Sequence, residues 1–339
     1  MSQEFELIDQ YFLPLSQNLM TDEVGIGDDG AVMTPPANHQ LVVVTDTMVE
    51  GVHFPIDTLP QDIAWKAVAV NLSDLAAMGA KPGFISLALT LPENEQAWLH
   101  SFSAGLAAVC SQYQAPLIGG DTTKGPLCIT VTAHGWVERG GALLRSGAQA
   151  GDIIAISGVI GDAGLGLKFA LNPLLESEQA CLNDVDIQSC LTALNRPNPQ
   201  LELGQLLQQH ACSAIDISDG LLADLSHILE QSNKRLGLQA ENAMGAELDL
   251  DALPLSSAMQ KWIEKTNEWQ LPLSAGDDYQ LCFTVKPENW VQLKALSESL
   301  GLSIHKVGHV TEQPGVVIKD VRGLSHALNN VDDLGYQHF

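Results

Sequence analysis

Apolar positions in the first part of the chain recur with two periods, which predict alternating helices and strands. Between residues 61 and 80, apolar side chains repeat every three to four positions, the spacing of one helix face: Trp65, Val68, Leu72 and Leu75. Gly79 and Pro82 end that helix. The same reasoning predicts a second helix at 94–113, and strands at 41–45, 84–91 and 127–137.

A glycine-aspartate turn near residue 148 begins a second block of elements. A strand is expected at 153–157, followed by the glycine-rich segment 158–166, and a helix with an apolar face is expected behind Asp216. Residues 172–200 are polar and contain proline and asparagine, so we expect a surface excursion there. Further strands are expected at 281–285, 303–307 and 315–318. The pattern predicts a two-domain α/β (α+β) protein, with domains at 1–148 and 149–339.

Composition narrows the class of protein. The chain has 339 residues and is 45% hydrophobic, which is enough for two cores and excludes a disordered chain. Its net charge of −25 argues against nucleic acid as a partner, because binding a phosphate backbone requires a basic surface. No apolar run is long enough to span a membrane. The acidic N-terminus has no signal-peptide pattern, and the cysteines form no Cys-x-x-Cys pair. We therefore expect a cytoplasmic protein with reduced cysteines.

Six short segments place aspartate beside glycine, serine or threonine, and most of them adjoin an apolar run. They are Gly27-Asp28-Asp29-Gly30, Thr45-Asp46-Thr47, Ser73-Asp74-Leu75, Gly120-Asp121-Thr122-Thr123, Asp216-Ile217-Ser218-Asp219-Gly220 and Gly276-Asp277-Asp278-Tyr279. If these carboxylates converge they repel one another, and a divalent cation removes that repulsion. Oxygen ligands suit Mg²⁺, which also binds substrate phosphates. The segments therefore predict a Mg²⁺-nucleotide enzyme, with solvated turns as the alternative for individual motifs.

Known phosphate-binding loops do not account for these segments. Residues 25–30 match the spacing G-x-G-x-x-G, but Ala31-Val-Met-Thr-Pro-Pro follows and cannot form the long helix that a dinucleotide fingerprint needs. No G-x-x-x-x-G-K-[ST] loop and no protein-kinase motif set occurs. A bound nucleotide would therefore be held by a phosphate site of a different kind.

Several residues stand out individually. Asp74 lies inside an otherwise apolar helix, where aspartate is unfavourable unless it is paired or bound to metal; an exposed helix stripe is the alternative. Ser218 and Asp219 precede a helix and could bind an anion or simply cap the helix. Arg145, near the domain boundary, could clamp phosphates or be an ordinary surface residue, and His53 could be catalytic or merely packed.

Taken together, these motifs resemble the thiamine-monophosphate kinase family, within the group that includes aminoimidazole ribonucleotide synthetase. The resemblance runs from Gly25 to Tyr336, and its order makes it specific. It implies a two-domain fold and a homodimer in which the N-terminal sheets join in a barrel-like interface. The N-terminal domain would bind ATP and metal, and the C-terminal domain would complete the nucleotide and substrate site. A selenophosphate synthetase is disfavoured because no cysteine precedes Cys110.

The resemblance also implies roles for individual residues. Metal ligands would be Asp29, Thr45, Asp46, Asp74, Asp121, Asp216 and Asp219. Of these, the resemblance makes Asp46, Asp74 and Asp121 catalytic. Nucleotide contacts would come from Gly120, Asp121, Arg145 and Ser218, and substrate contacts from His53, Asp277 and Tyr336. The family often has glutamate where this chain has Asp277, which changes the reach of that side chain.

The activity implied is transfer of the γ-phosphoryl group of ATP to thiamine monophosphate, giving thiamine diphosphate and ADP. Several Mg²⁺ ions would take part, with K⁺ as a further candidate. The acceptor is a phosphate monoester with a second pKa near ~6, so it is a nucleophile without a general base. Direct in-line transfer is therefore expected. The alternatives are another ATP-dependent synthetase of the same group, and a non-catalytic nucleotide- or metal-binding module.

Overall fold

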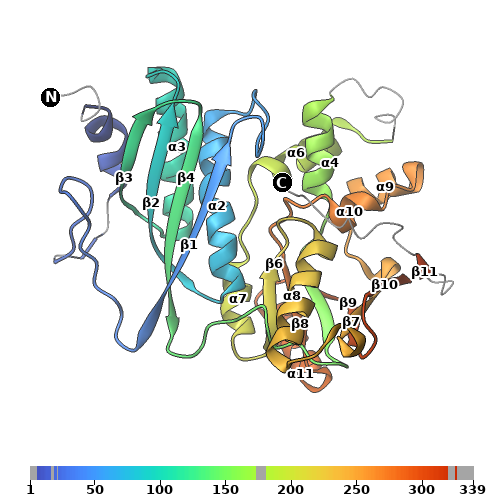
Figure 1. The fold of residues 1–339 in the computed structure, drawn as a ribbon. Helices are drawn as coiled ribbons and strands as arrows, with labels where there is room; N and C mark the ends of the chain where they lie inside the picture. Colours follow the sequence, from blue (N-terminus) through green and yellow to red (C-terminus); the bar gives the residue numbers. More distant parts are fainter. Residues whose placement is uncertain (1–5, 17–18, 21, 173–180, 320–324, 327–339) are drawn as a thin grey trace. The chain divides into compact units, whose positions relative to one another are not determined.

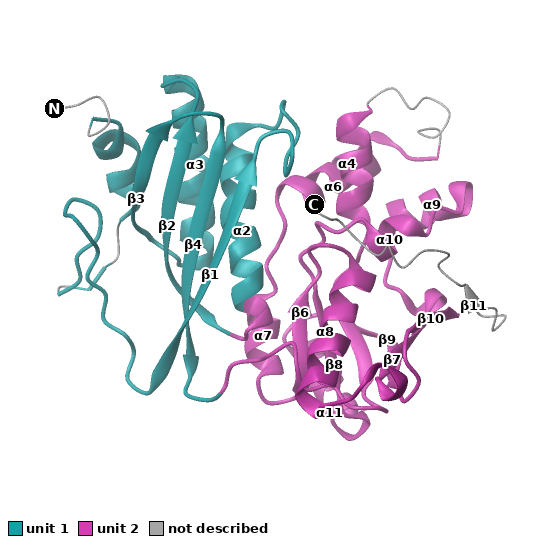
Figure 2. Ribbon diagram, in the orientation of Figure 1, with its two compact units in different colours: residues 1–75, 80–140 teal, residues 76–79, 141–339 magenta. Residues whose placement is uncertain are grey.

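The computed structural model describes residues 6–16, 19–20, 22–172, 181–319 and 325–326 (Figure 1). The chain divides into two compact units, shown in different colours in Figure 2. The first unit contains residues 1–75 and 80–140, and the second contains residues 76–79 and 141–339. Each unit has its own sheet and its own layer of helices.

The first unit is built on a four-stranded sheet with the strand order β1-β4-β2-β3. The strands are β1 (His39–Val49), β2 (Lys81–Leu91), β3 (Leu117–Lys124) and β4 (Cys128–Glu138). β2 pairs with β3 in parallel, whereas β4 pairs antiparallel with both β1 and β2. Two helices, α2 (Pro60–Ala77) and α3 (Gln96–Tyr113), cover one face of this sheet (Figure 1). Before β1, the chain forms a π-helical turn (Ile8–Phe12) and a 3₁₀ turn (Leu13–Leu15).

Alternation along the strands gives this sheet one buried and one open face. Leu87 and Val131 on the helix-covered face are 4% and 1% exposed. Leu41 and Val43 of β1 point the other way and are 50% and 54% exposed. Successive strand residues point to opposite faces, so the exposed apolar side chains belong to one uncovered surface.

The second unit contains a seven-stranded sheet with the order β11-β10-β7-β9-β5-β8-β6. Its strands are β5 (Ile153–Ser157), β6 (Ala211–Asp216), β7 (Gly245–Asp249), β8 (Leu281–Val285), β9 (Ile304–Thr311), β10 (Val316–Lys319) and β11 (Ser325–His326). Its helices are α4 (Asp162–Leu171), α6 (Asp184–Asn195), α7 (Leu201–Leu207), α8 (Leu221–Leu236), α9 (Ser257–Thr266), α10 (Gln270–Ser274) and α11 (Pro287–Ser299). Short 3₁₀ turns occur at Ala240–Asn242 and Leu250–Ala252.

The core of the second unit lies mainly between the sheet and α8. Ile154 and Ile156 of β5 pack in one cluster with Leu222 and Leu225 of α8, all of them fully buried. A smaller cluster joins α4, α6 and α9 around Trp262, whose ring meets Phe169 edge to face with centroids 5.8 Å apart. The apolar face predicted behind Asp216 is therefore the face that α8 buries.

The sequence pattern located most of the elements but missed others. The expected surface excursion at 172–200 is wrong for its described part, because residues 184–195 form helix α6. Helix α6 begins with a capping box between Asn183 and Asp186, and it buries Cys190 and Leu194. Because the residues on its outer face are mostly polar, the composition of this segment did not indicate a helix. Strands β1 and β3 also extend through Asp46 and Asp121, which were expected at or beyond the strand ends.

Two expectations drawn from composition agree with the structure. All six cysteines are free thiols. No helix among the described residues is both long enough and apolar enough to cross a membrane.

Candidate functional site

The loop between β6 and α8 carries three predicted site residues. Asp216 is the last residue of β6 and is 4% exposed, while Ser218 and Asp219 follow in a turn. The interpretation of Ser218 or Asp219 as helix cap is wrong: Gly220 occupies the N-cap position of α8, and no side chain caps this helix end. Both polar side chains therefore belong to the loop rather than to the helix terminus.

A residue that the sequence analysis missed holds this loop in place. Asp224, in the first turn of α8, is 2% exposed. One of its carboxylate oxygens accepts the backbone N–H groups of Ser218, Asp219 and Gly220 at 3.0, 3.1 and 3.2 Å. The only sequence signal for Asp224 was an acidic residue on the apolar side of a helix, which is costly unless its hydrogen bonds are satisfied.

Negative charge accumulates around Asp224. The pKa of Asp224 is raised to about 8, mainly by burial and then by the negative charges of Asp216 and Asp219. Such mutual repulsion is relieved when a cation binds nearby. The oxygen donors of this loop therefore fit Mg²⁺, and Asp216 and Asp219 are the residues that would hold it.

The segment that contains Asp277 is joined to this loop by three backbone hydrogen bonds. The N–H of Asp277 donates to the carbonyl of Ser218 at 2.8 Å, and the N–H of Tyr279 donates to the carbonyl of Ile217 at 2.8 Å. The N–H of Ile217 donates to the carbonyl of Gln280 at 2.7 Å. Two motifs more than fifty positions apart in sequence thus form one structure, which we call the paired loops (216–220 and 276–280).

The backbone of the second paired loop is strained. Gly276, Asp277 and Tyr279 have φ values of 71°, 61° and 48°, in the left-handed region that non-glycine residues rarely adopt. At Gly276, an added Cβ would lie 2.2 Å from the carbonyl oxygen of Ser218. Strain of this kind persists where the surroundings enforce it, and it often marks functional sites.

A glycine-rich turn supports the paired loops. The N–H of Gly161 donates to Asp278 at 2.8 Å, and the hydroxyl of Ser256 donates to Asp162 at 2.6 Å. Burial raises the pKa of both Asp278 and Asp162 above the ordinary value, and the nearby charge of Asp162 also raises that of Asp278. Sequence analysis noted Asp278 only as part of a motif, and burial is what distinguishes it from Asp277.

Arg145 lies on the segment that enters the second unit. It is exposed, and the carbonyl of its neighbour Leu144 accepts the N–H of Ala214 in β6 at 3.0 Å. The segment therefore runs alongside the strand that ends at Asp216. The alternatives of phosphate clamp and surface arginine both remain compatible with this position.

In the first unit, Asp46 and Asp74 lie near the same buried asparagine. The N–H of Asp46 in β1 donates to the side-chain oxygen of Asn71 in α2 at 3.0 Å. Asn71 is fully buried, and its amide donates in turn to the carbonyl of Ala67. Asp74 follows Asn71 by three positions on α2, so it lies on the same side of the helix, one turn further on.

Thr45 and Asp121 lie on the same face of the sheet but at opposite edges. The hydroxyl of Thr45 donates to that of Thr132 at 3.0 Å, and Thr47 and Thr130 pair at 2.8 Å. By strand register, Thr47, Thr130 and Ala88 share a row with Asp121. Because β1 and β3 are separated by two strands, the row spans about 14 Å. One chain does not bring Asp121 next to Thr45 and Asp46 for a shared metal ion.

The position of Gly120 in β3 has no room for a side chain. An added Cβ there would lie 1.8 Å from the carbonyl oxygen of Leu87 in β2, whereas Gly119 has no atom within 4 Å of the equivalent position. The close approach of two backbones, rather than an unusual φ value, accounts for the second glycine of the motif.

His53 lies in the turn that follows β1. Its Nδ1 accepts the N–H of Val49 at 3.0 Å. In the neutral ring the proton is therefore on Nε2, which makes that nitrogen a hydrogen-bond donor. Lys66 of α2 is only 3% exposed, and its ammonium lies 3.5 Å from the carbonyl oxygen of His53. Sequence analysis missed Lys66, because nothing in a helical pattern distinguishes a buried lysine from an exposed one.

The remaining predicted residues lie apart from these groups or outside the described chain. Asp29 is exposed in a turn between the bridged residues Val24 and Val32. That turn is followed by no helix, as expected from the rejected dinucleotide motif. Tyr336 lies outside the described residues. Within the described part of the chain, no three His, Cys, Asp or Glu side chains form a group that could hold a metal ion by themselves.

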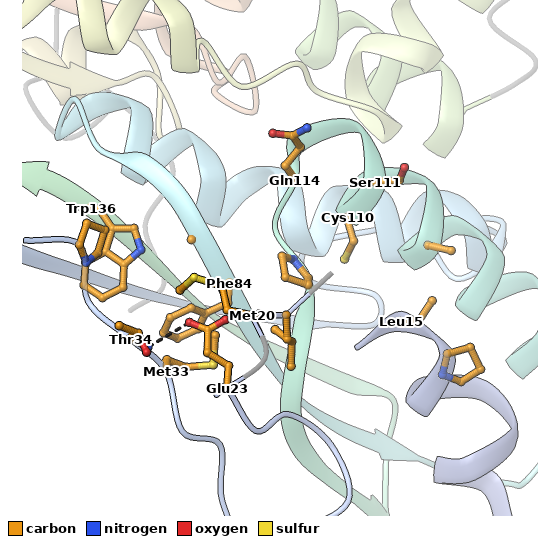
Figure 3. A pocket seen from close by; sticks show the side chains of 16 residues that line it. Leu15, Met20, Glu23, Met33, Thr34, Phe84, Cys110, Ser111, Gln114 and Trp136 are labelled. Atoms are coloured by element: carbon orange, nitrogen blue, oxygen red, sulfur yellow. Dashed lines mark hydrogen bonds between the residues drawn. The ribbon is translucent and has the colours of Figure 1, made fainter. Parts of the chain in front are cut away.

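A separate pocket in the first unit contains none of the predicted site residues (Figure 3). It has a volume of about 830 Å³. Its one carboxylate, Glu23, accepts the N–H groups of Met20 and Thr34 at 2.9 and 3.0 Å and so stabilises the surrounding loop. Most of its lining is apolar or uncharged: Pro14, Leu15, Leu19, Met20, Met33, Thr34, Pro36, Gly83, Phe84, Ala107, Cys110, Ser111, Gln114, Pro116 and Trp136. This pocket does not suit phosphate or Mg²⁺.

Comparison with known families defines the class of this protein. The family described as AIR synthase related protein, N-terminal domain, matches residues 27–137. The family described as AIR synthase related protein, C-terminal domain, matches residues 149–321. These matches together span most of the chain and define an AIR synthase related protein with both of its domains.

Individual relatives are more specific. Thiamine-monophosphate kinase of Haemophilus influenzae is 42% identical over 99% of this chain and 98% of its own. The crystal structure of thiamine-monophosphate kinase from Stenotrophomonas maltophilia K279a is 44% identical, with a TM-score of 0.79 over 88% of this chain and 91% of its own. A structure of AaThiL complexed with AMPPCP and TMP is 30% identical, with a TM-score of 0.75 over 99% and 97% of the two chains. The chain belongs to the thiamine-monophosphate kinase family of AIR synthase related proteins.

Proposed function

We propose that this protein transfers the γ-phosphoryl group of ATP to thiamine monophosphate, releasing thiamine diphosphate and ADP. Membership of the family supports the reaction, and a relative binds an ATP analogue together with TMP. The structural observation that carries the proposal is the pairing of loops 216–220 and 276–280. It fixes Ser218, a predicted nucleotide contact, against Asp277, a predicted contact of the phosphate acceptor.

The chemistry fits a site made of carboxylates. The acceptor phosphate is largely dianionic at neutral pH, so it needs no general base. The difficulty is to bring two anionic groups into line. Mg²⁺ would neutralise charge and orient the phosphates when bound. The residues proposed to hold it are Asp29, Thr45, Asp46, Asp74, Asp121, Asp216 and Asp219.

The protein's own donors account for the remaining contacts. We assign the nucleotide to Gly120, Asp121, Arg145 and Ser218, where an exposed arginine can grip phosphate oxygens with two parallel hydrogen bonds. His53 would donate from Nε2 to an oxygen of the acceptor, because its Nδ1 already accepts a backbone N–H. Asp277 and Tyr336 complete the acceptor contacts. Transfer is direct, without a phosphoenzyme, and trapping of a phosphorylated aspartate during turnover would contradict this.

The experiment that tests the reaction measures ADP release from Mg-ATP with and without thiamine monophosphate. Thiamine diphosphate is measured in parallel through its fluorescent oxidation product. Formation of the diphosphate in step with ADP supports the proposal. ADP release that depends on formylglycinamidine ribonucleotide would instead indicate the synthetase alternative, and nucleotide binding without turnover would indicate a binding module. Titrating Mg²⁺ and K⁺ in the same assay measures the ion requirement.

We further propose that the working form is a homodimer whose first units join edge to edge. Leu41 and Val43 expose apolar side chains on the open sheet face, and monomeric proteins rarely leave such faces uncovered. Edge strands β1 and β3 each offer unpaired backbone groups. Pairing β1 of one copy with β3 of another would bring Asp121 of one chain to the strand that carries Thr45 and Asp46 of the other. Each site would then take residues from both copies.

Subunit mixing tests this arrangement. Asp46→Asn and Asp121→Asn should each inactivate the homodimer. In a mixed dimer of the two variants, one of the two sites keeps both carboxylates, so an equilibrated mixture should recover about a quarter of wild-type activity. No recovery after verified subunit exchange would place both residues in a site made by one chain.

Reaction and partners agree with a cytoplasmic location, which we propose on the basis of the ATP requirement and the free cysteines. Thiamine monophosphate and ATP are the proposed small-molecule partners, and the strong negative charge opposes nucleic-acid binding.

A further inference from the structure

Tyr279 makes a contact that none of the assigned roles explains. Its hydroxyl donates to one carboxylate oxygen of Asp277 at 3.0 Å. Both side chains are partly buried, so the hydrogen bond is only partly exposed to water. A hydrogen bond to a charged acceptor is stronger than one between neutral groups. The bond therefore restricts which way the short Asp277 side chain points.

The backbone around this pair is arranged to permit the contact. Asp277 and Tyr279 both have left-handed φ values, 61° and 48°, with a buried residue, Asp278, between them. Residues two apart in an extended strand would point to the same face but along parallel directions. Here the two left-handed residues turn the chain so that the tyrosine hydroxyl reaches back to the carboxylate. The strained backbone conformation therefore helps to hold the carboxylate of Asp277 in one orientation.

The backbone of Asp277 and Tyr279 is also held by hydrogen bonds to neighbouring segments. The N–H groups of Asp277 and Tyr279 donate hydrogen bonds to the neighbouring loop, to the carbonyls of Ser218 and Ile217 respectively. Asp278 is held by the N–H of Gly161. With the backbone fixed on both sides, the remaining freedom of Asp277 is rotation of its side chain, and the tyrosine hydroxyl limits that rotation.

We propose that Tyr279 is a positioning residue for the acceptor substrate: it orients Asp277 so that the carboxylate faces the cationic, amine-bearing part of thiamine monophosphate. This rests on the proposed function. A carboxylate repels the phosphate of the acceptor, whereas the thiazolium charge and the aminopyrimidine N–H groups attract it. Asp277 therefore recognises the organic part of the substrate, and Tyr279 supplies the orientation that this recognition needs.

The test is Tyr279→Phe, which removes only the hydroxyl. We expect KM for thiamine monophosphate to rise about tenfold, with kcat and the KM for ATP changed less than about twofold. Inhibition by thiamine, which has no phosphate, should weaken by the same factor as KM, while inhibition by inorganic pyrophosphate should not change. Tyr113→Phe is the matched control: that tyrosine bonds the side chain of Gln112 on α3, and removing its hydroxyl should leave all five constants unchanged.

A double-variant cycle separates positioning from general structure. Asp277→Asn alone should also raise KM for thiamine monophosphate, and adding Tyr279→Phe to it should change little, because the charge to be oriented is already gone. Additive effects, an equal rise in the KM for ATP, or an unchanged KM in Tyr279→Phe would each overturn the proposal. Failure of the proposed function itself would be seen earlier, as absence of thiamine diphosphate in the wild-type reaction.

Discussion

The two units carry the same kinds of predicted site residue but position them differently. In the second unit, residues from two distant motifs meet in the paired loops, held by backbone hydrogen bonds and by the buried carboxylate of Asp224. In the first unit, Thr45 and Asp46 lie on one edge strand and Asp121 lies on the other. One set is preorganised within a single chain, and the other is spread across a sheet.

The difference follows from the elements that carry the residues. A loop can turn back on itself, so hydrogen bonds can gather its carboxylates at one point. A strand keeps its residues in a straight line, and strands in a sheet keep a fixed separation of about 4.8 Å. Carboxylates on opposite edges can meet only if another sheet edge approaches. In the second unit, one chain therefore brings the predicted site residues together by itself. In the first unit, we propose that a second copy is needed to do so.

The largest expected effect tests this separation directly. Asp219→Asn and Asp277→Asn should each lower kcat/KM by about 10²–10³-fold, by removing charge from the paired loops. A mixture of these two variants should stay inactive after subunit exchange, because every second unit in it lacks one of the two carboxylates. This is the opposite of the outcome expected for Asp46→Asn mixed with Asp121→Asn. Recovery of activity in both mixtures would remove the contrast between the units.

A second prediction concerns the strained turn. Gly276→Ala should lower the free energy of unfolding by about 2–4 kcal/mol, because its φ is 71° and the new Cβ would meet the Ser218 carbonyl. Urea denaturation measures the change. Gly119→Ala in β3 is the control, since its Cβ meets no atom within 4 Å. Equal stability of the two variants would show that the paired loops are not tightly fitted.

A third prediction uses the raised pKa of Asp224, about 8 in the folded protein. The folded chain holds a proton there that the unfolded chain releases near its ordinary value of 3.8. The resulting stabilisation is complete below that value and is lost as pH rises through 8. In EDTA, the free energy of unfolding should therefore fall by about 1.4 kcal/mol between pH 7 and pH 9. The Asp224→Asn variant should lack this part of the pH dependence, and identical slopes for the two proteins would refute the assignment.

The smallest expected effect concerns the open face of the first unit. Thr47→Val removes the hydroxyl that pairs with Thr130 at 2.8 Å across β1 and β4. An exposed cross-strand pair contributes less than about 1 kcal/mol, so thermal unfolding should shift by only a few degrees. A much larger loss would show that the Thr47–Thr130 pair is not exposed in the folded protein.

The sequence by itself determined the acidic motifs, their order and the family they resemble, because these depend on residue identity and spacing alone. It also located most strands and the helix behind Asp216, since burial of one face imposes a period on the residues. Helix α6 was missed because most residues on its exposed face are polar and one of its three buried residues is Asp186. Composition gives little information where one side of an element faces water.

Only the tertiary structure decided which motifs meet. Sequence order could not show that Asp277 is bonded to the loop of Ser218, that Tyr279 reaches back to Asp277, or that Asp224 binds three backbone N–H groups. Nor could it show that Asp46 and Asp121 lie at opposite edges of one sheet. The physical reason is that local pattern reports how each residue relates to its own strand or helix. Strand order and loop pairing are set by long-range packing, which no short window of sequence contains.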